Sequence, residues 1–573
     1  MAEELQGIPA APGFARGYSL RWEPPSLQLP IFSPSDMNLE KRRLSAARQT
    51  AAQQLRGLVA QIGEQVGAAE AALFEAQAMF LEDPALAARA ESLIDSGVNA
   101  EQAWQSACEY FAGQLESLAD EILRARSADV RDVARRVIEV LMGVQTKSKL
   151  TAPVIIIAHD LAPSQTVALD ATKVLAFCTA EGGPTSHTAI LAKALGIPAV
   201  VGLGEQILGV ADGTLLLVDG MSGLVIADPA SSLLDDFDQR VLVESQRRAH
   251  DAKLAFQPAV TRDGQRVEIV ANAGNVDDAR LALEQGAEGI GLLRTEFLFL
   301  NRSHAPDEQT QYAAYRTIME LMGTRPLVAR TLDIGGDKEA PYFDFGVEAN
   351  PFLGYRAIRI SLDHPQEFKS QLRALLRAGA GHDLRIMFPM IATLDEVSSA
   401  RRLLDEAQAE LKARVVDMTA RVQVGIMVEV PSVVMLADRF AREVDFFSVG
   451  TNDLTQYTLA AERGNKRLAH LNDSCHPAVL KEIQQVAVAA RKAGIWVGVC
   501  GEMAGDLQAI PLLLGLGVTE LSVAPRQIPA VKQAVRSWSM EDAQALARKA
   551  LELDGAQAVR GIVMDFMRQG NMG

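Results

Sequence analysis

Hydrophobic residues between positions 36 and 145 recur with the spacing of an α-helix. Three stretches repeat apolar residues every three, four or seven positions. Their members are Leu44, Ala51, Leu55, Leu58, Ile62, Phe111, Leu115, Leu118, Ile122, Val130, Val133, Val137 and Leu141. Asn99, with Gln102 three residues later, is a start signal for one helix. The pattern predicts an antiparallel helical bundle.

The period changes after Ala152, where short runs rich in Val and Ile are bounded by Gly, Pro or Asp. Such runs are typical of buried strands. They cover residues 153–158, 173–177, 198–202, 214–218 and 223–227. Residues 7–20 are also strand-like. We therefore predict a small α/β domain made of residues 1–35 and 146–230, with the helical bundle 36–145 as an insertion within it.

Residues 231–256 are charged and helix-prone, and Pro258 ends the pattern. Their apolar anchors are Leu233, Phe237, Val241 and Val243. This composition is typical of a helical linker.

Eight apolar runs alternate with helical or loop segments in the remaining chain, residues 257–573. The runs are 267–271, 289–293, 326–330, 385–389, 424–428, 445–449, 495–499 and 520–524. Eight strands alternating with helices over this length favour a (β/α)8 TIM barrel. An open, doubly wound parallel sheet is the alternative. The fold class predicted for the whole chain is therefore multidomain α/β.

Composition narrows the class of protein. The 573 residues carry 72 acidic and 56 basic side chains, a net charge of −16, without a basic cluster. This balance disfavours nucleic acid and anionic membranes as partners and favours a basic protein. No apolar run approaches the roughly 18 residues of a membrane span, so no membrane insertion is expected. Four scattered cysteines and the absence of a leader-like N-terminus indicate a reduced, cytoplasmic protein.

Charged residues and one thiol follow the predicted barrel strands. In a barrel the carboxyl ends of the strands form one mouth, where active sites lie. The residues at these ends are Asn272, Arg294, Arg330 with Asp333, Met390, Glu429, Asn452 with Asp453, Cys500 with Glu502, and Pro525. Arg294 and Arg330, with Arg463 as a third candidate, suit an anion carrying phosphate oxygens. Exposed, solvated arginines are the alternative interpretation.

Glu429 and Asp453 end consecutive strands, and carboxylates beside a bound phosphate are the usual ligands of Mg²⁺. A structural ion pair with the arginines is the alternative. Cys500, in the sequence GVCGEMAGD, is either a buried inert cysteine or, at a strand end, a thiol that protonates a carbon centre.

A second candidate site lies at residues 182–198, GGPTSHTAILAKALGIP, where a Gly-Gly turn leads through His187 into a helix-forming segment. A histidine at a helix N-terminus can accept a phosphoryl group that the main-chain amides stabilise. An ordinary polar loop histidine is the alternative. The sequence has no P-loop and no GxGxxG after a strand, which argues against ATP as the phosphoryl donor.

Seven segments together resemble Enzyme I of the bacterial sugar phosphotransferase system, the phosphoenolpyruvate-protein phosphotransferases. They are GGPTSHTAILAKALGIPAVVG, GLLRTEFLF, ARTLDIGGDK, NPFLGYRAIR, VGIMVEVPS, FSVGTNDLTQY and GVCGEMAGD. The resemblance runs in the same order over nearly the whole chain. It departs from the usual family pattern at Lys193, Tyr355 and Glu462, none of which belongs to the chemistry described above.

The resemblance implies a swivelling phosphohistidine domain whose inserted helices dock the carrier protein HPr, and a phosphoenolpyruvate-binding barrel that forms a homodimer. His187 would carry the phosphoryl group, with Thr166 as its hydrogen-bonding neighbour, and Cys500 would donate the proton that completes pyruvate. Glu429 and Asp453 would hold Mg²⁺. The residues that would contact phosphoenolpyruvate are Arg294, Arg330, Arg356, Asn452, Asp453 and Arg463.

The predicted function is therefore transfer of the phosphoryl group of phosphoenolpyruvate to His187 and then to a histidine of HPr, the first step of sugar uptake. Enzyme I modules also occur fused to other domains, and the chain is either such a module or a stand-alone protein. A regulatory protein that binds phosphoenolpyruvate without turnover is the competing interpretation.

Overall fold

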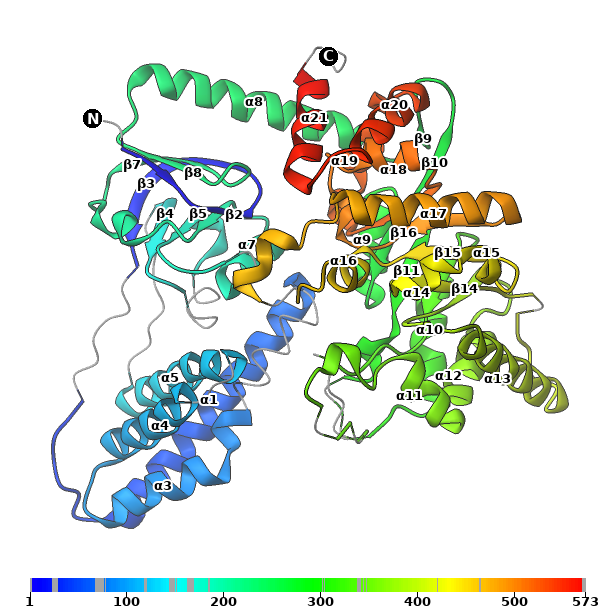
Figure 1. The fold of residues 1–573 in the computed structure, drawn as a ribbon. Coiled ribbons are helices and arrows are strands. Elements are labelled where there is room, and N and C mark those ends of the chain that lie inside the picture. The colour runs from blue at the N-terminus through cyan, green and yellow to red at the C-terminus, as the bar shows by residue number, and fades with distance from the viewer. Residues whose placement is uncertain are drawn as a thin grey trace. The chain divides into compact units, whose positions relative to one another are not determined.

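The chain forms two compact units, residues 1–243 and 244–573, in the computed structural model (Figure 1). The structure describes residues 3–22, 29–66, 77, 79–117, 121–143, 150, 152–161, 169–183, 186–300, 302, 304–336, 342–343, 345–346, 348–419, 421–462 and 465–568. Each unit has its own sheet and its own core. No helix among these residues is long and apolar enough to cross a membrane.

The first unit contains an eight-stranded sheet with the order β1-β8-β7-β3-β4-β5-β6-β2. Its strands are β1 (Glu3–Gln6), β2 (Ile8–Ala11), β3 (Phe14–Arg21), β4 (Val154–Ala158), β5 (Val174–Thr179), β6 (Ala199–Val201), β7 (Leu215–Asp219) and β8 (Leu224–Ala227). Each of the five apolar runs predicted after residue 152 overlaps a strand, although β5 and β7 extend beyond their runs by two residues and one residue. Strands β3 to β6 pair in parallel, and the other pairs are antiparallel.

Both faces of the central strands are buried, which explains why β4 is apolar throughout. Ile155 and Ile157 point to one core, whereas Ile156 packs on the other face with Phe177. Helix α7 (His187–Leu195) covers that second face through Ala189 and other small residues. Because successive side chains of a strand alternate between faces, a strand covered on both sides must be hydrophobic at every position.

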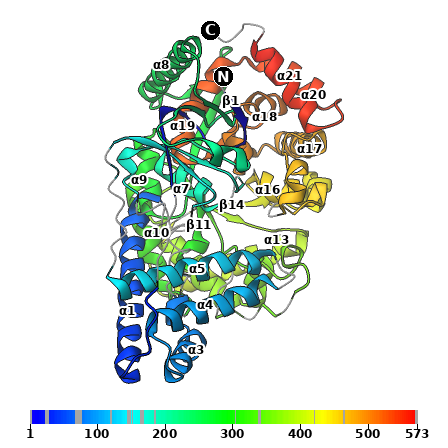
Figure 2. The same cartoon turned by 90° about the vertical axis from the view of Figure 1, so that its left-hand side faces the viewer.

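The chain leaves the sheet after β3 and returns to it at the neighbouring strand β4. The described residues between them include the helices α1 (Met37–Val66), α3 (Pro84–Asp95), α4 (Ala100–Glu116) and α5 (Glu121–Met142). Helices α4 and α5 run side by side in both views (Figures 1 and 2). Their shared core includes the fully buried Trp104. The predicted helix start is confirmed, because the Asn99 side chain accepts a hydrogen bond from the Gln102 amide at 2.9 Å.

The predicted helical periodicity is confirmed where side chains are described. Leu44, Ala51, Leu55, Val130, Val133 and Val137 are buried, and Phe111, Leu115 and Leu141 pack against the same core. Leu118 and the side chains of Leu58, Ile62 and Ile122 lie outside the described residues.

Helix α8 (Ser231–Leu254) occupies the predicted linker and contains the division between the two units. Phe237 is buried against the sheet, with its ring 5.6 Å from that of Phe14, and Leu233 and Val241 pack beside it. The prediction that Val243 is an apolar anchor is wrong, since this residue is 61% exposed. Val243 is the last residue of the first unit and does not belong to the cluster that Leu233, Phe237 and Val241 form on the sheet.

The second unit contains eight parallel strands that close into a barrel. They are β10 (Arg266–Ala273), β11 (Ile290–Arg294), β12 (Leu327–Arg330), β13 (Leu384–Phe388), β14 (Gln423–Val428), β15 (Phe446–Val449), β16 (Trp496–Val499) and β17 (Glu520–Val523). Each pairs with the next, and β17 pairs back onto β10. Strand β9 (Ala259–Val260) is antiparallel to β10. The predicted (β/α)8 barrel is confirmed, and the open-sheet alternative is wrong.

Helices surround the barrel strands (Figure 1). They are α9 (Val276–Glu284), α10 (Glu308–Met322), α11 (Ile358–Asp363), α12 (Pro365–Ala378), α13 (Leu394–Ala413), α14 (Pro431–Met435), α15 (Ala437–Phe440), α16 (Thr451–Leu459), α17 (Pro477–Ala493), α18 (Ile510–Leu516), α19 (Ile528–Ser537), α20 (Met540–Ala550) and α21 (Ala556–Arg568). Alternate residues of the strands pack outward against them in one continuous core.

Side chains fill the barrel interior, so a ligand can enter only at its ends. Inward-pointing Leu292, Val328, Met387, Met427 and Phe446 pack together with Cys500. The ring of Phe446 stacks on Trp496 at 4.3 Å, and both are the first residues of their strands. The amino-terminal end of the barrel is therefore packed, and the candidate site residues lie at the opposite end.

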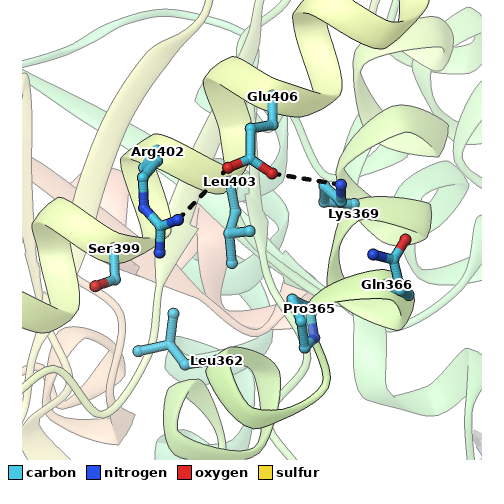
Figure 3. A pocket seen from close by; sticks show the side chains of 8 residues that line it. All are labelled: Leu362, Pro365, Gln366, Lys369, Ser399, Arg402, Leu403 and Glu406. Atoms are coloured by element: carbon cyan, nitrogen blue, oxygen red, sulfur yellow. Dashed lines mark ion pairs between the residues drawn. The ribbon is translucent and has the colours of Figure 1, made fainter.

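A cavity of about 320 Å³ lies outside the barrel mouth, beside α12 and α13 (Figure 3). Glu406 projects between two cations there, 3.4 Å from Nζ of Lys369 and 3.6 Å from Arg402. One carboxylate of the lining thus faces two cations, and Lys369 pairs in addition with Glu410 at 2.8 Å. None of the predicted site residues reaches the cavity.

Candidate active site

The carboxyl ends of the barrel strands bring together most of the residues predicted for a phosphate site. Arg294 and Arg330 are the last residues of β11 and β12. Glu429 directly follows β14, and Cys500 directly follows β16. Asn452 and Asp453 lie in the first turn of α16, which begins after β15. Arg463 lies outside the described residues.

A chain of alternating charges connects five buried residues of this mouth. Arg330 pairs with Glu296 and, at 3.0 Å, with Asp333. Asp333 also pairs with Arg356 at 3.2 Å, and Arg356 lies 3.6 Å from Asp453. All five are nearly inaccessible to water. Burial of so many charges is tolerated only because each faces an opposite charge.

The two buried arginines are held firmly in the charged form. Burial alone would lower the pKa of Arg330 and of Arg356, but the neighbouring carboxylates outweigh burial and raise both pKa values. Asp333 acts on both arginines. Two fixed guanidinium groups, with ten donor N–H bonds in planar forks, suit an anion with several oxygens.

Glu429 is a strongly perturbed carboxylate of the mouth. Burial raises the pKa of Glu429 well above its ordinary value, and the charges of Asp453 and Asp333 add to this effect. One of its oxygens accepts a hydrogen bond from the Met390 amide at 2.6 Å. Met390 adopts a left-handed conformation with φ 53°, which is unusual for a residue with a Cβ. This strained backbone aims the amide at the carboxylate.

Asp453 presents an oxygen that the described residues leave unsatisfied. Its Oδ2 faces Arg356, whereas no described residue hydrogen-bonds to the buried Oδ1. Buried polar atoms normally have partners, so an unpartnered oxygen indicates a site for a ligand or ion. Across the residues that the structure describes, no three side chains of His, Cys, Asp or Glu converge as a complete metal site. Any metal here would need ligands from a substrate or from water.

Cys500 is buried at the top of the barrel interior. Its thiol lies 3.6 Å from the carbonyl of Val449. Burial raises the pKa of Cys500 to about 11, so the sulfur keeps its proton at neutral pH. The charges of Glu429, Arg330 and Arg294 all act on this thiol. A protonated thiol at the edge of a charged mouth has the chemistry of a general acid.

Amide side chains hold the loops around Cys500. Asn452 accepts a hydrogen bond from the Glu502 amide at 2.9 Å and donates one to the Glu502 carboxylate at 3.3 Å. Asn272 donates to the carbonyl of Cys500 at 3.2 Å and accepts from Ser522 at 2.7 Å. These bonds hold the main chain at Cys500 and at Glu502, the residues that follow β16.

Sequence reasoning missed two residues that organise the mouth. Glu296 lies in the quoted segment GLLRTEFLF, but no role was predicted for it; it pairs with Arg330. Tyr457 follows Asp453 by four residues and contacts Arg356 at 3.4 Å. The i, i+4 spacing on a helix was a usable signal for Tyr457. Nothing in the sequence indicates which arginine forms the ion pair with Glu296.

The second predicted site lies at the start of α7 in the first unit. His187 is the first residue of this helix, and Ser186 caps it by accepting a hydrogen bond from the Ala189 amide at 3.4 Å. Gly182, with φ 107°, provides the turn before it. Thr188 is buried and donates to Asp160 at 3.3 Å, which ties the helix start to the loop after β4. Thr166 and the side chain of His187 lie outside the described residues.

Three family descriptions match the chain, and all concern enzymes that use phosphoenolpyruvate. The N-terminal domain of such enzymes matches residues 6–126, the mobile domain matches 150–223, and the phosphoenolpyruvate-binding domain matches 248–540. The barrel with its buried arginines and the α/β domain with its histidine-led helix thus define a phosphoenolpyruvate-utilising enzyme.

Comparison with individual proteins narrows this class. The phosphoenolpyruvate-protein phosphotransferase of Geobacillus stearothermophilus is 43% identical over 562 residues, covering 98% of this chain and 97% of that protein. That of Bacillus subtilis (strain 168) is 41% identical over 569 residues, covering 99% and 100%. A multiphosphoryl transfer protein of Rhodobacter capsulatus is 44% identical over 560 residues, covering 97% of this chain and 67% of that protein. The chain belongs to the phosphoenolpyruvate-protein phosphotransferases, the Enzyme I family.

Proposed function

We propose that this chain transfers the phosphoryl group of phosphoenolpyruvate to His187, releases pyruvate, and then passes the group to a histidine of an HPr-type carrier protein in the sugar phosphotransferase system. The observation that carries this proposal is the buried charge chain at the barrel mouth. Its two arginines suit a phosphorylated carboxylic acid, and the unpartnered oxygen of Asp453 lies among them.

Phosphoenolpyruvate binds through the arginines of the mouth. Arg330 and Arg356 hold phosphate and carboxylate oxygens from their fixed positions, and Arg294 adds a third cation. Arg294 makes no ion pair with the described residues, so it can turn toward the substrate. We assign Arg463 to the same role on the family resemblance alone, and Asn452 to a hydrogen bond with the substrate.

Glu429 and Asp453 fit a Mg²⁺ ion. Magnesium prefers one or two carboxylates together with substrate phosphate oxygens and water. The unpartnered Oδ1 of Asp453 and the crowding of carboxylates around Glu429 are what a bound cation would relieve. When bound, the ion would neutralise charge on the phosphoryl group and on the departing enolate.

The chemical step uses a neutral imidazole and a thiol. A ring nitrogen of His187 attacks phosphorus, the bond from phosphorus to the enol oxygen breaks, and its electron pair leaves with the enolate of pyruvate. The Cys500 S–H then gives its proton to the methylene carbon, which becomes the methyl group of pyruvate. The resulting thiolate takes a proton from solvent. A pKa of about 11 keeps Cys500 protonated between turnovers.

The phosphoryl group on His187 is stabilised by the N-terminal amides of α7. His187 belongs to the first unit and the mouth to the second. Transfer therefore requires the two units to meet at the mouth, and the histidine must then become available to the carrier. We assign the accompanying motion to the segment around α8. We also propose that Thr166 forms a hydrogen bond with the phosphohistidine.

The inserted helices are the proposed docking surface for the carrier. A groove of about 250 Å³ there is lined mainly by Phe80, Leu86, Phe111, Leu115 and Val130. Two large side chains next to these residues in the sequence are exposed: Met79, which precedes Phe80, is 72% exposed, and Tyr110, which precedes Phe111, is 43% exposed. The excess of acidic residues in the chain favours a basic partner.

We further propose that the barrel forms a homodimer and that the protein is cytoplasmic. All four cysteines are free and buried, which suits a reducing compartment. Light scattering on residues 257–573 tests the dimer: the account expects a dimer at concentrations where the full chain is dimeric, and a monomer would contradict it.

Incubation with phosphoenolpyruvate labelled in the phosphoryl group tests the central activity. The account expects the protein to become labelled in the presence of Mg²⁺, with a label that is lost in acid and stable in base, as a phosphohistidine is. A protein that only senses phosphoenolpyruvate would bind it reversibly, carry no covalent label and release no pyruvate.

A further inference from the structure

The hydroxyl of Tyr457 joins two parts of the barrel mouth that lie more than a hundred residues apart in the sequence. Tyr457 is on α16, four residues after Asp453. Its hydroxyl donates to the main-chain carbonyl of Phe352 at 2.5 Å and lies 3.4 Å from Nη1 of Arg356. Its third neighbour is the sulfur of Met390 at 3.8 Å. One side chain thus contacts both the segment that carries Arg356 and the guanidinium itself.

The segment held by Tyr457 also supports Arg356 from another side. The ring of Phe352 lies beneath the Arg356 guanidinium, with 5.9 Å between the guanidinium carbon and the ring centroid. Residues Pro351–Leu353 form only a short 3₁₀ turn, and Ala357 has a left-handed φ of 52°. Such a segment has few regular main-chain bonds of its own. A hydroxyl anchored on the rigid helix α16 therefore limits where Phe352 and Arg356 can lie.

We propose that Tyr457 is a positioning residue of the phosphoenolpyruvate site: its hydroxyl holds residues 350–357 against α16 and so keeps Arg356 oriented to bind the substrate. The inference rests on the proposed role of Arg356 in binding phosphoenolpyruvate. Ion pairs with Asp333 and Asp453 orient the guanidinium itself, and the Tyr457 hydroxyl adds a restraint on the irregular segment from which the side chain extends. A segment held in place before the substrate arrives loses less conformational freedom on binding. Burial raises the pKa of Tyr457 to about 12, so the hydroxyl remains a donor at neutral pH.

Tyr457→Phe removes the hydroxyl and keeps the ring. We expect the KM for phosphoenolpyruvate to rise about three- to tenfold, which is the value of one hydrogen bond. We expect kcat to stay within about twofold, because Arg356 is misplaced equally in the substrate complex and in the transition state. A general loosening of the mouth would instead lower kcat through Glu429 and Cys500.

Tyr342→Phe is a matched control from the same barrel. The Tyr342 hydroxyl donates to the carbonyl of Phe299 at 2.6 Å, so this variant also removes a hydrogen bond from a tyrosine to a carbonyl. It should leave the KM unchanged. Hydrogen exchange gives a readout independent of activity: amides of residues 353–357 should exchange faster in Tyr457→Phe than in Tyr342→Phe. Equal exchange in the two variants would contradict the positioning role.

A double-mutant cycle with Arg356→Lys tests whether Tyr457 acts through Arg356. If it does, adding Tyr457→Phe to Arg356→Lys should change the KM less than twofold, since coupled residues are not additive. A full three- to tenfold effect in that background, or an unchanged KM in Tyr457→Phe alone, would overturn the inference while leaving the proposed function intact. An unchanged KM in Arg356→Lys alone would instead refute the binding role of Arg356, and this inference with it.

Discussion

Two buried arginines at the barrel mouth owe their orientation to carboxylates of the chain. Asp333 accepts from both, with 3.0 Å to Arg330 and 3.2 Å to Arg356. A buried charge without its partner costs about 3–5 kcal/mol, so each guanidinium is restricted to the orientation that keeps its pair. The same pairing lowers the net positive charge of the mouth. A Mg²⁺ ion held by Glu429 and Asp453 would restore this positive charge. An anionic substrate and a cation would therefore bind together.

Cys500→Ala should slow pyruvate formation about 10²- to 10⁴-fold, because a positioned general acid contributes a factor of that size. Binding of phosphoenolpyruvate should change little, since the thiol acts on the carbon after the phosphoryl group has left. Steady-state turnover and direct titration of phosphoenolpyruvate measure the two quantities. In deuterated solvent, the methyl group formed from stereospecifically C3-labelled substrate should also lose its stereochemical preference.

Cys475→Ala is the control for this prediction, since Cys475 is another buried thiol of the barrel and the site residues that the structure describes form no hydrogen bond with it. Its turnover should match that of the wild type. Wild-type turnover with unchanged stereochemistry in Cys500→Ala would identify Cys500 as a structural cysteine and transfer the role of proton donor to Glu502 or a water molecule.

The barrel strands were predictable because both of their faces are buried, one in the barrel interior and the other under the surrounding helices. A strand such as β14, buried from Val424 to Val428, is an unbroken apolar run bounded by polar residues. The candidate site residues were predictable for a related reason: parallel strands all end at the same mouth, so polar residues after each run must converge.

Other features depend on three-dimensional pairing and left no signal in the sequence. The partner of Glu296 is 34 residues away, and nothing in the spacing selects Arg330 over another arginine. The left-handed backbone at Met390 has no glycine or asparagine to indicate it. Val243 has the helical spacing of an anchor, but its exposure depends on where α8 leaves the first unit. The hydrophobic pattern of the sequence predicts helices and strands well. Ion pairs and the ends of the elements can be identified only in the folded structure.

The buried carboxyl group of Glu520 should make the stability of the barrel depend on pH. This residue is buried at the amino-terminal end of β17, facing Gly498 and Glu268 of the neighbouring strands, and burial raises its pKa to about 8. Arg385 opposes the shift and Glu268 adds to it. Between the ordinary glutamate pKa and about 8, the folded state binds the proton more tightly than the unfolded state does. Stability should therefore fall as pH rises through this window and then level off.

Glu520→Gln should flatten this dependence, because the amide cannot ionise. Denaturant unfolding at a series of pH values measures the effect, and the variant should become the more stable protein near pH 9, by an amount on the order of several kcal/mol. Glu320→Gln is a control on the barrel surface, where the i, i+4 pair with Arg316 is expected to matter by at most about 0.5 kcal/mol. A wild-type curve as flat as that of Glu520→Gln would contradict the assignment.

At the scale of the whole molecule, the first unit should fold alone and exchange phosphate with phosphorylated HPr without reacting with phosphoenolpyruvate. It contains His187 and the inserted helices, whereas the arginines lie in the second unit. The fragment should extend to residue 243, because Phe237 packs on Phe14 and Arg240 pairs with Asp219 at 2.7 Å.

A fragment of residues 1–230 is the matched comparison, since it lacks these contacts. It should unfold at a lower temperature than residues 1–243 and retain the exchange reaction. Labelling of either fragment by phosphoenolpyruvate would show that the division of donor and acceptor sites between the units is wrong.

In the proposed function, phosphoenolpyruvate binds in the barrel and delivers its phosphoryl group to His187 in the other unit. The most direct measurement compares the full-length wild type with His187→Ala, using phosphoryl-labelled phosphoenolpyruvate for covalent labelling and titration calorimetry with Mg²⁺ for binding. We expect His187→Ala to carry no label but to bind phosphoenolpyruvate with unchanged affinity, because the arginines and carboxylates of the mouth are intact. Labelling of His187→Ala to the wild-type extent would contradict the proposed function.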